Sequence, residues 1–122
     1  MEKNDNFIIQ LRKGVFDLAI LSLISKQPMY GYEITSSLQA IPVFHIPNGS
    51  IYPILNRITK NHWAVSYWEE SGDGPKRKYY RITDEGREIL HSRLHDYDAV
   101  YQALMLLAKG EDKNEQGTIL CK

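Results

Sequence analysis

The chain has 122 residues and a mass of 14.1 kDa, with 43% hydrophobic and 25% charged residues. This is the composition of a globular protein and the length of one domain with a modest core. The formal net charge is zero, so net charge by itself gives no argument for a nucleic acid or an acidic partner.

The first predicted element is a helix from Leu11 to Lys26, which ends before Pro28 because proline disfavours helix at the preceding residue. This segment is apolar on nearly all sides, as a central core helix is. Its apolar stretch VFDLAILSLI is too short to cross a membrane and contains Asp17, and the preceding MEKNDNFIIQ lacks the order of a signal peptide. We therefore expect a soluble, cytoplasmic protein with no membrane span.

A second, short helix is predicted within MYGYEITSSLQAI, starting after Gly31 and closed by Pro42. Ile34, Leu38 and Ile41 fall on one side of this helix and are expected to face the core. The loop VFHIP that follows is apolar, so we expect it to pack against the core as well.

A third helix is predicted from Ser50, as its N-cap, to about Asn61. Its apolar residues recur with the i, i+3, i+4, i+7 spacing of a buried stripe: Ile51, Ile54, Leu55 and Ile58. The opposite face carries an aromatic ring, an amide and cations but no carboxylate: Tyr52, Pro53, Asn56, Lys60 and, toward the flank, Arg57. Such a face suits phosphates and base edges in a DNA groove, although an ordinary solvated face gives the same pattern.

The next segments predict a β-hairpin. Ala64 to Glu70 is strand-like, SGDGP has turn chemistry, and KRKYYRI reads as the return strand. The hairpin carries four cations with tyrosines between them: Lys76, Arg77, Lys78 and Arg81. Short helices in helix-turn-helix order, followed by a cationic hairpin, predict a mainly α, winged helix-turn-helix fold with a small β-hairpin. A solvated hairpin with chance cations is the alternative.

The charges are unevenly distributed along the chain. From Asn48 to Arg81 six cations stand against three anions, whereas from Ile82 onward eight anions stand against five cations. The two parts differ in sign and are therefore expected to differ in role.

A last helix is predicted from residue 84 to about Ala108, with Thr83 as its cap and Asp84 and Glu85 in its first turn. At ~1.5 Å per residue this helix is roughly 39 Å long. Its apolar residues step alternately by four and three, the pattern of a heptad seam: Leu90, Leu94, Tyr97, Tyr101, Leu104 and Ala108. Because so long an apolar arm outreaches a small core, we expect a second copy to cover it; folding back onto the first helix is the alternative.

No arrangement of residues in this sequence points to catalysis. There is no nucleotide loop and no pair of carboxylates placed for acid–base work, so we expect neither an enzyme nor a cofactor. His91 and His95 have a metal-compatible i, i+4 spacing, but no third ligand is obvious, and solvated residues are the preferred interpretation. The single Cys121 excludes an intramolecular disulfide and fits a reducing cytoplasm.

Three segments resemble, in order and spacing, the signature segments of PadR-type transcriptional regulators: LRKGVFDLAILSLISKQPMYGYEI, NGSIYPILNRITKN and GPKRKYYRITDEGR. Together they span Leu11 to Arg87. The resemblance implies a winged helix-turn-helix DNA-binding domain over residues 1–83, a dimerisation helix over residues 84–108, and a tail over 109–122 whose polar, glycine-broken composition predicts flexibility. It also implies a repressor that binds an inverted-repeat operator of double-stranded DNA as a homodimer and is released by a small hydrophobic or aromatic effector.

Matches to the family's DNA-contact positions, combined with the polar face of the third helix, define the candidate DNA-binding residues. These are Tyr32, Ser50, Tyr52, Pro53, Asn56, Arg57, Lys60, Lys76, Arg77 and Lys78. The candidate dimerisation residues are Leu94, Tyr97, Tyr101, Leu104, Leu107 and Ala108.

The chain departs from the family pattern at two places. The family commonly has a Gly-aliphatic pair between the third helix and the wing, where this chain has His62, Trp63 and Ala64. Drug-sensing members of its short branch carry a tryptophan on the last helix, where this chain has only tyrosines. A multidrug effector is therefore not favoured. Phe16, Tyr97 and Tyr101 are the candidate effector-pocket residues, with aromatic core packing as their preferred role.

A second hypothesis is a winged-helix module that docks a protein partner through the third helix and the wing. Salt separates the two hypotheses, because a DNA binder loses affinity steeply with added salt and prefers one operator, whereas a docking module binds duplex weakly and without preference.

Overall fold

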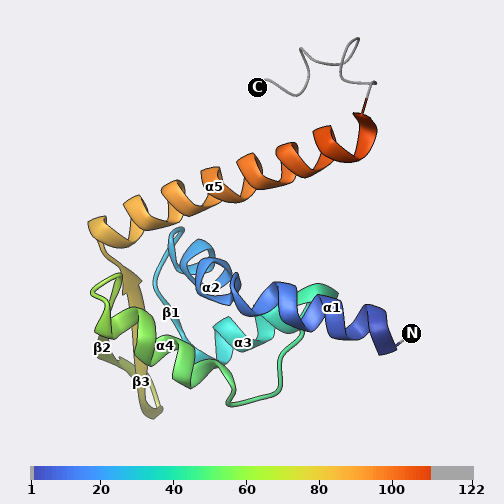
Figure 1. Cartoon of the computed structure of the whole chain (residues 1–122). Coiled ribbons are helices and arrows are strands. Elements are labelled where there is room, and N and C mark those ends of the chain that lie inside the picture. The colour runs from blue at the N-terminus through green and yellow to red at the C-terminus, as the bar shows by residue number, and fades with distance from the viewer. Residues whose placement is uncertain (1, 111–122) are drawn as a thin grey trace. The chain divides into compact units, whose positions relative to one another are not determined.

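The computed structural model of the chain describes residues 2–110 (Figure 1). Its helices are α1 (Glu2–Lys13), α2 (Phe16–Ile24), α3 (Gly31–Gln39), α4 (Ile51–Lys60) and α5 (Asp84–Lys109), with a short 3-10 helix η1 (Pro42–Phe44). Its strands are β1 (Met29–Tyr30), β2 (Ala64–Ser71) and β3 (Gly74–Ile82). The chain forms two compact units, one ending at Leu90 and one starting at His91. The predicted division at residue 83 follows the start of α5, whereas the first unit also includes the first turns of that helix.

The first unit is built on helices α2, α3 and α4 and an antiparallel sheet (Figure 1). Their apolar side chains form one core, in which the most completely buried residues are Ile20, Leu21, Ile24, Ile34, Leu38, Ile51, Leu55 and Ile58. The stripe predicted on the third helix is therefore confirmed for three of its four members, while Ile54 is only half-buried. The predicted mainly α, winged helix-turn-helix fold with a small β-hairpin is confirmed.

The predicted first helix is wrong in its bounds, because the chain breaks into α1 and α2 around Gly14 and Val15. The Val15 N–H donates to the Arg12 carbonyl three residues earlier, and Val15 itself has φ −117° and ψ −3°, outside helical geometry. The part of α1 before Leu11 was not predicted, and Phe7 and Leu11 lie exposed on this helix.

The second helix ends earlier than predicted, so Ile41 does not face the core and is 45% exposed. Ile41 precedes Pro42, and the proline ring pushes it into an extended conformation with φ −111° and ψ 112°. The expectation for the following loop is confirmed at Phe44, whose ring centroid lies 5.6 Å from that of Phe16, and at Ile46, which is buried. Val43 in the same loop is exposed, against the prediction.

The sheet has the strand order β1-β3-β2, and both pairings are antiparallel. β2 and β3 form the predicted hairpin, which is the wing of the fold. Its turn is shorter than predicted: Gly72 and Asp73 connect the strands, with Gly72 at φ +68°, and Pro75 already belongs to β3. The two-residue strand β1 was not predicted, because two residues are too few to show a periodicity.

The Thr83 side chain and the close approach of Gly86 to Trp63 join the end of α4, the base of the wing and the start of α5. The Thr83 hydroxyl donates to the His62 carbonyl at 2.7 Å and accepts from the Gly86 N–H at 2.9 Å, so the predicted cap of the last helix is confirmed. A Cβ at Gly86 would collide with the Trp63 carbonyl, so only glycine permits this close approach. These contacts fix the wing's position relative to α4.

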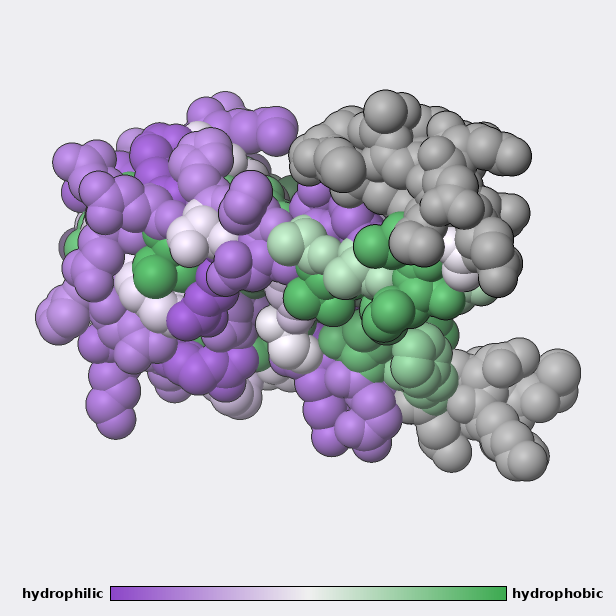
Figure 2. Space-filling view, turned by 45° about the horizontal axis from the view of Figure 1, so that its top comes forward, coloured by the Kyte–Doolittle hydropathy of each residue, from purple (hydrophilic) through white to green (hydrophobic). Residues whose placement is uncertain are grey.

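From His91 onward the described chain is the remainder of α5, which ends as predicted near residue 108. Part of the hydrophobic surface that the protein exposes is visible in Figure 2. On this part of α5 the exposed large apolar side chains are Leu94, Tyr97, Val100, Tyr101, Leu104 and Leu107. No helix within residues 2–110 is both long and apolar enough to span a membrane. Most of the predicted tail, including Cys121, lies outside the described residues.

Candidate nucleic-acid interface

The outward face of α4 is exposed as the sequence predicted. Tyr52 is 48% exposed, and Pro53, Asn56 and Lys60 are also exposed, while the opposite side of the helix is buried in the core. The face therefore presents a phenol, an amide and an ammonium group to solvent.

The predicted N-cap position of Ser50 is confirmed, but its side chain does not cap the helix. Ser50 stands at the N-cap position, but its backbone has φ −71° and ψ −15°, and its side chain makes no capping hydrogen bond. A capping side chain needs an extended backbone at that position. Here a turn precedes the helix instead, in which the Ser50 N–H donates to Pro47 and the Tyr52 N–H donates to Gly49.

Arg57, on the flank of the same helix, has a partner that the sequence did not reveal. Its guanidinium donates to both carboxylate oxygens of Asp17 on α2, at 2.5 Å and 3.2 Å. These hydrogen bonds raise the pKa of Arg57 above its ordinary value. The side chain of Arg57 is 50% exposed and that of Asp17 only 16%, so the pair joins α4 to α2 at the edge of the core.

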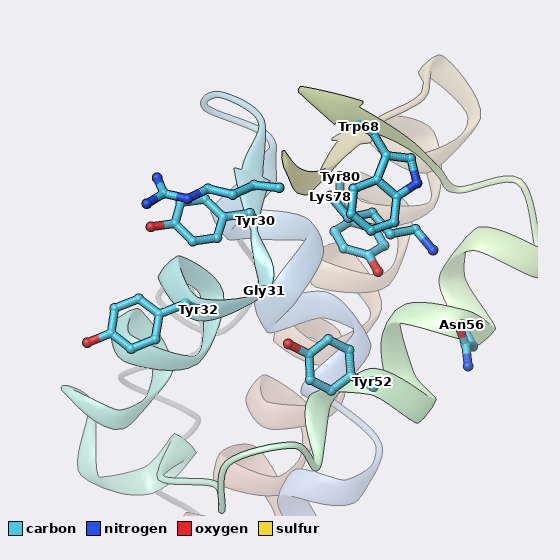
Figure 3. A pocket seen from close by; sticks show the side chains of 9 residues that line it. Tyr30, Gly31, Tyr32, Tyr52, Asn56, Trp68, Lys78 and Tyr80 are labelled. Carbon is cyan, nitrogen blue, oxygen red and sulfur yellow. The ribbon is translucent and has the colours of Figure 1, made fainter. Parts of the chain in front are cut away.

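A groove of about 550 Å³ lies between α4, the start of α3 and the wing. Figure 3 shows Tyr52 and Asn56 on α4, Tyr30, Gly31 and Tyr32 around the start of α3, and Trp68, Lys78 and Tyr80 on the wing. The lining set is completed by Arg77. It includes five aromatic side chains, two cations and one amide, and it contains no carboxylate.

Tyr52 and Tyr80 both line this groove, and Tyr52 packs against Gly31. A Cβ on Gly31 would lie 2.6 Å from the Tyr52 hydroxyl, so the absence of a side chain at Gly31 makes room for that ring. Burial raises the pKa of the Tyr80 phenol above its ordinary value, and the neighbouring Tyr52 adds to the rise. Both effects favour the neutral phenol of Tyr80.

The three predicted wing cations do not share one face. Successive residues of a strand point to opposite sides, and Trp68 pairs with Lys78 while Glu69 pairs with Arg77. Lys76 and Lys78 therefore lie on the same side of the hairpin as Trp68, and Arg77 lies on the other.

Each side of the hairpin holds its cations differently. The Lys78 ammonium lies 5.9 Å from the Trp68 ring centroid and 6.0 Å from that of Tyr80. Arg77 instead places its guanidinium carbon 4.5 Å from the Tyr30 ring centroid. Tyr30 also packs edge-on against Tyr79, at 5.4 Å, so Arg77 extends an aromatic ladder that ties β1 to the wing.

Sequence reasoning missed four residues of the groove: Tyr30, Gly31, Trp68 and Tyr80. Strand alternation links Trp68 to Lys78, but only once the pairing register of the hairpin is known. Of the predicted set, Tyr32, Tyr52, Asn56, Arg77 and Lys78 line the groove. Within the described residues, no group of three or more His, Cys, Asp or Glu side chains is placed to hold a metal ion.

The fold and this groove define a winged helix-turn-helix protein. The family model described as "Transcriptional regulator PadR-like family" matches residues 20–92, more than half of the chain. The chain belongs to the PadR-like family of transcriptional regulators, which are not enzymes.

Solved structures give the same assignment. A PadR-like transcriptional regulator from Bacillus cereus strain ATCC 14579 is 38% identical, with a TM-score of 0.73 over 84% of this chain and 99% of that one. A PadR family regulator from Eggerthella lenta DSM 2243 is 27% identical, with a TM-score of 0.79 over 90% and 96% of the two chains. Bacillus subtilis PadR in complex with operator DNA is 30% identical, with a TM-score of 0.60 over 66% of this chain and 46% of that one. This chain thus spans less than half the length of Bacillus subtilis PadR.

Proposed function

We propose that the protein is a cytoplasmic repressor that binds double-stranded operator DNA through α4 and the wing. The observation that carries this proposal is the exposed face of α4 beside a groove lined by cations, an amide and aromatic rings without a carboxylate. Phosphates meet no like charge on that lining, and the amide can donate to and accept from a base edge. The similarity to Bacillus subtilis PadR, a negative transcriptional regulator solved with operator DNA, supports both the partner and the repression.

Within this interface Asn56 is assigned to a base edge, and Lys60, Lys76 and Lys78 to phosphates. Tyr32, Ser50, Tyr52 and Pro53 lie in or beside the same surface and complete the contact. Arg57 takes a lesser part because Asp17 already neutralises its guanidinium group. Arg77 also takes a lesser part, since its guanidinium carbon lies 4.5 Å from the Tyr30 ring centroid, closer than the Lys78 ammonium lies to the Trp68 or Tyr80 ring.

The proposal includes a homodimer formed through α5 and an inverted-repeat operator. The exposed apolar side chains of α5 from Leu94 to Leu107 support this assembly, since a monomer rarely leaves so much contiguous apolar surface in water. Ala108 continues the same seam and is also exposed.

The proposal also includes release of the repressor from DNA by a small hydrophobic or aromatic effector. Tyr97 and Tyr101 are exposed on α5 and available to stack on a flat ligand. Phe16 is instead buried against Phe44, which favours the core role for this ring. Binding of aromatic compounds by the dimer, with loss of operator binding, is the expected behaviour.

The test begins with selection of duplexes from a random pool and measurement of binding to the selected operator at several salt concentrations. Lys60→Ala should weaken binding to all sequences and lower the salt slope by about one. Asn56→Ala should relax preference at one position and cost about 1–3 kcal/mol there. Weak, unselective duplex binding by the parent would instead favour the protein-docking module.

A further inference from the structure

Trp68 stands out among the groove residues because it is 61% exposed. It lies on the side of the hairpin that is buried nearer the base, where Ala64 and Ile82 are 1% and 4% exposed. The same side emerges from the core as the strands run toward the tip. Trp68 is therefore an exposed ring of the wing that borders the groove beside Lys78 and Tyr80 (Figure 3).

The surroundings of Trp68 point to an anionic partner with an apolar part. The Lys78 ammonium is held over the Trp68 ring, and within the described chain no carboxylate forms a salt bridge with Lys78. The ring offers a flat apolar face and one indole N–H donor, next to a positive charge that is free to bind an anion. A deoxyribose–phosphate strand presents this combination, a largely apolar sugar face flanked by phosphates.

We propose that Trp68 is a further DNA contact: its indole packs against a deoxyribose of the strand that lies in the groove, while Lys78 pairs with an adjacent phosphate. The inference rests on the proposed function. It adds a non-ionic contact from the wing, which the proposed function otherwise describes only by its cations.

Tryptophan fluorescence tests this contact directly, because the chain has only two tryptophans and the other, Trp63, is 9% exposed. Addition of the selected operator should quench or blue-shift the parent's emission. With excitation that is selective for tryptophan, the change should be absent in Trp68→Phe, in which buried Trp63 is the remaining tryptophan. Trp68→Ala should bind operator on the order of tenfold more weakly, with an unchanged salt slope, since no ion pair is lost.

Two variants serve as controls. Lys78→Gln should lower the salt slope by about one, which separates an ionic contact from that of Trp68. Tyr67→Ala removes a neighbouring ring on the opposite side of the same strand, where it stacks on Tyr79, and should affect affinity much less than Trp68→Ala.

The outcomes distinguish this inference from the proposed function. If the parent binds the operator but its emission does not change and Trp68→Ala binds as the parent does, the contact is refuted and the proposed function stands. If Tyr67→Ala weakens binding as much as Trp68→Ala, hairpin integrity explains the loss and the contact is also refuted. A parent without salt-dependent operator binding refutes the proposed function itself.

Discussion

At the scale of single residues, His62 follows the end of α4 in a backbone conformation that lowers the stability of the fold. His62 has φ +66°, the left-handed conformation that favours glycine. Its N–H donates to the Thr59 carbonyl, and the Trp63 N–H donates to the Ile58 carbonyl, both at close to 3 Å. These two bonds form a Schellman motif, which normally carries glycine at this position. Glycine in the Gly-aliphatic pair common in the family adopts this left-handed conformation without strain. In this chain His62 adopts it instead.

His62→Gly should stabilise the fold by about 0.5–1 kcal/mol, because glycine relieves the left-handed strain and loses only part of that gain to unfolded-state entropy. Chemical denaturation of the parent and the variant measures the difference. His62→Ala is the matched control, since alanine removes the imidazole but keeps the strain, and it should give no such gain. Equal stabilisation by both variants would assign the effect to the imidazole.

Residue-scale prediction from the sequence succeeded where a periodicity carried the information. Helical spacing alone separates Ile51, Leu55 and Ile58, which are buried, from Tyr52 and Asn56, which are exposed. The partner of Arg57 was beyond such reasoning, because Asp17 lies 40 residues away in the sequence and meets it only after α2 packs against α4.

At the scale of secondary-structure elements, the wing separates its cations by strand alternation. Lys76 and Lys78 lie on the side of the hairpin that carries Trp68, whereas Arg77 lies on the other side and is held against Tyr30. Of the three, Arg77 and Lys78 line the groove. The wing cations therefore differ in their immediate surroundings, and they are expected to contribute unequally to DNA binding.

Neutralising the wing cations one at a time should reveal this separation. Lys76→Gln and Lys78→Gln should each weaken operator binding and lower the salt slope by about one, whereas Arg77→Gln should leave the slope nearly unchanged. The triple variant should bind several-fold to about a thousandfold more weakly. Fluorescence anisotropy over a salt series measures each slope, and circular dichroism checks the fold. An Arg77→Gln slope reduced as much as the others would show that Arg77 leaves Tyr30 to bind phosphate.

The sequence predicted the type of most helices and strands better than it predicted where they begin and end. Turn residues and cap residues located the hairpin and the start of α5, since Gly72 and Thr83 act through local backbone chemistry. The break at Gly14 was missed because apolar residues continue across it. The strand β1 forms only by pairing with β3, as between Met29 and Tyr80, which are about 50 residues apart in the sequence. No local sequence pattern indicates such a pairing.

At the scale of the whole molecule, the apolar side chains of α5 raise the question of assembly. Tyr101 and Leu104 are each 58% exposed and Leu107 is 76% exposed. Their spacing of three residues places them within one broad stripe of the helix. A two-fold contact with the α5 of a second copy would remove that stripe from water and leave each chain with its own α4 and wing.

Leu104→Asp combined with Leu107→Asp should therefore convert the dimer into a monomer, because two unpaired carboxylates per chain would have to enter the apolar contact. Light scattering should show the parent at twice the chain mass and the variant at half of the parent's mass. The matched control is His91→Asp with His95→Asp, which adds the same charges to exposed positions of α5 away from the seam and should remain dimeric.

The same variant links assembly to DNA binding. In a dimer two copies of α4 would enter successive major grooves about 34 Å apart, so the operator should read as an inverted repeat. Once one half-site is bound, the second is engaged at the high effective concentration that the dimer provides. The Leu104 and Leu107 variant should lose operator affinity by roughly a hundredfold or more, yet retain weak binding to a single half-site. A parent that is already monomeric, or a variant that stays dimeric and binds the operator normally, would remove α5 from the assembly and require another cover for its apolar stripe.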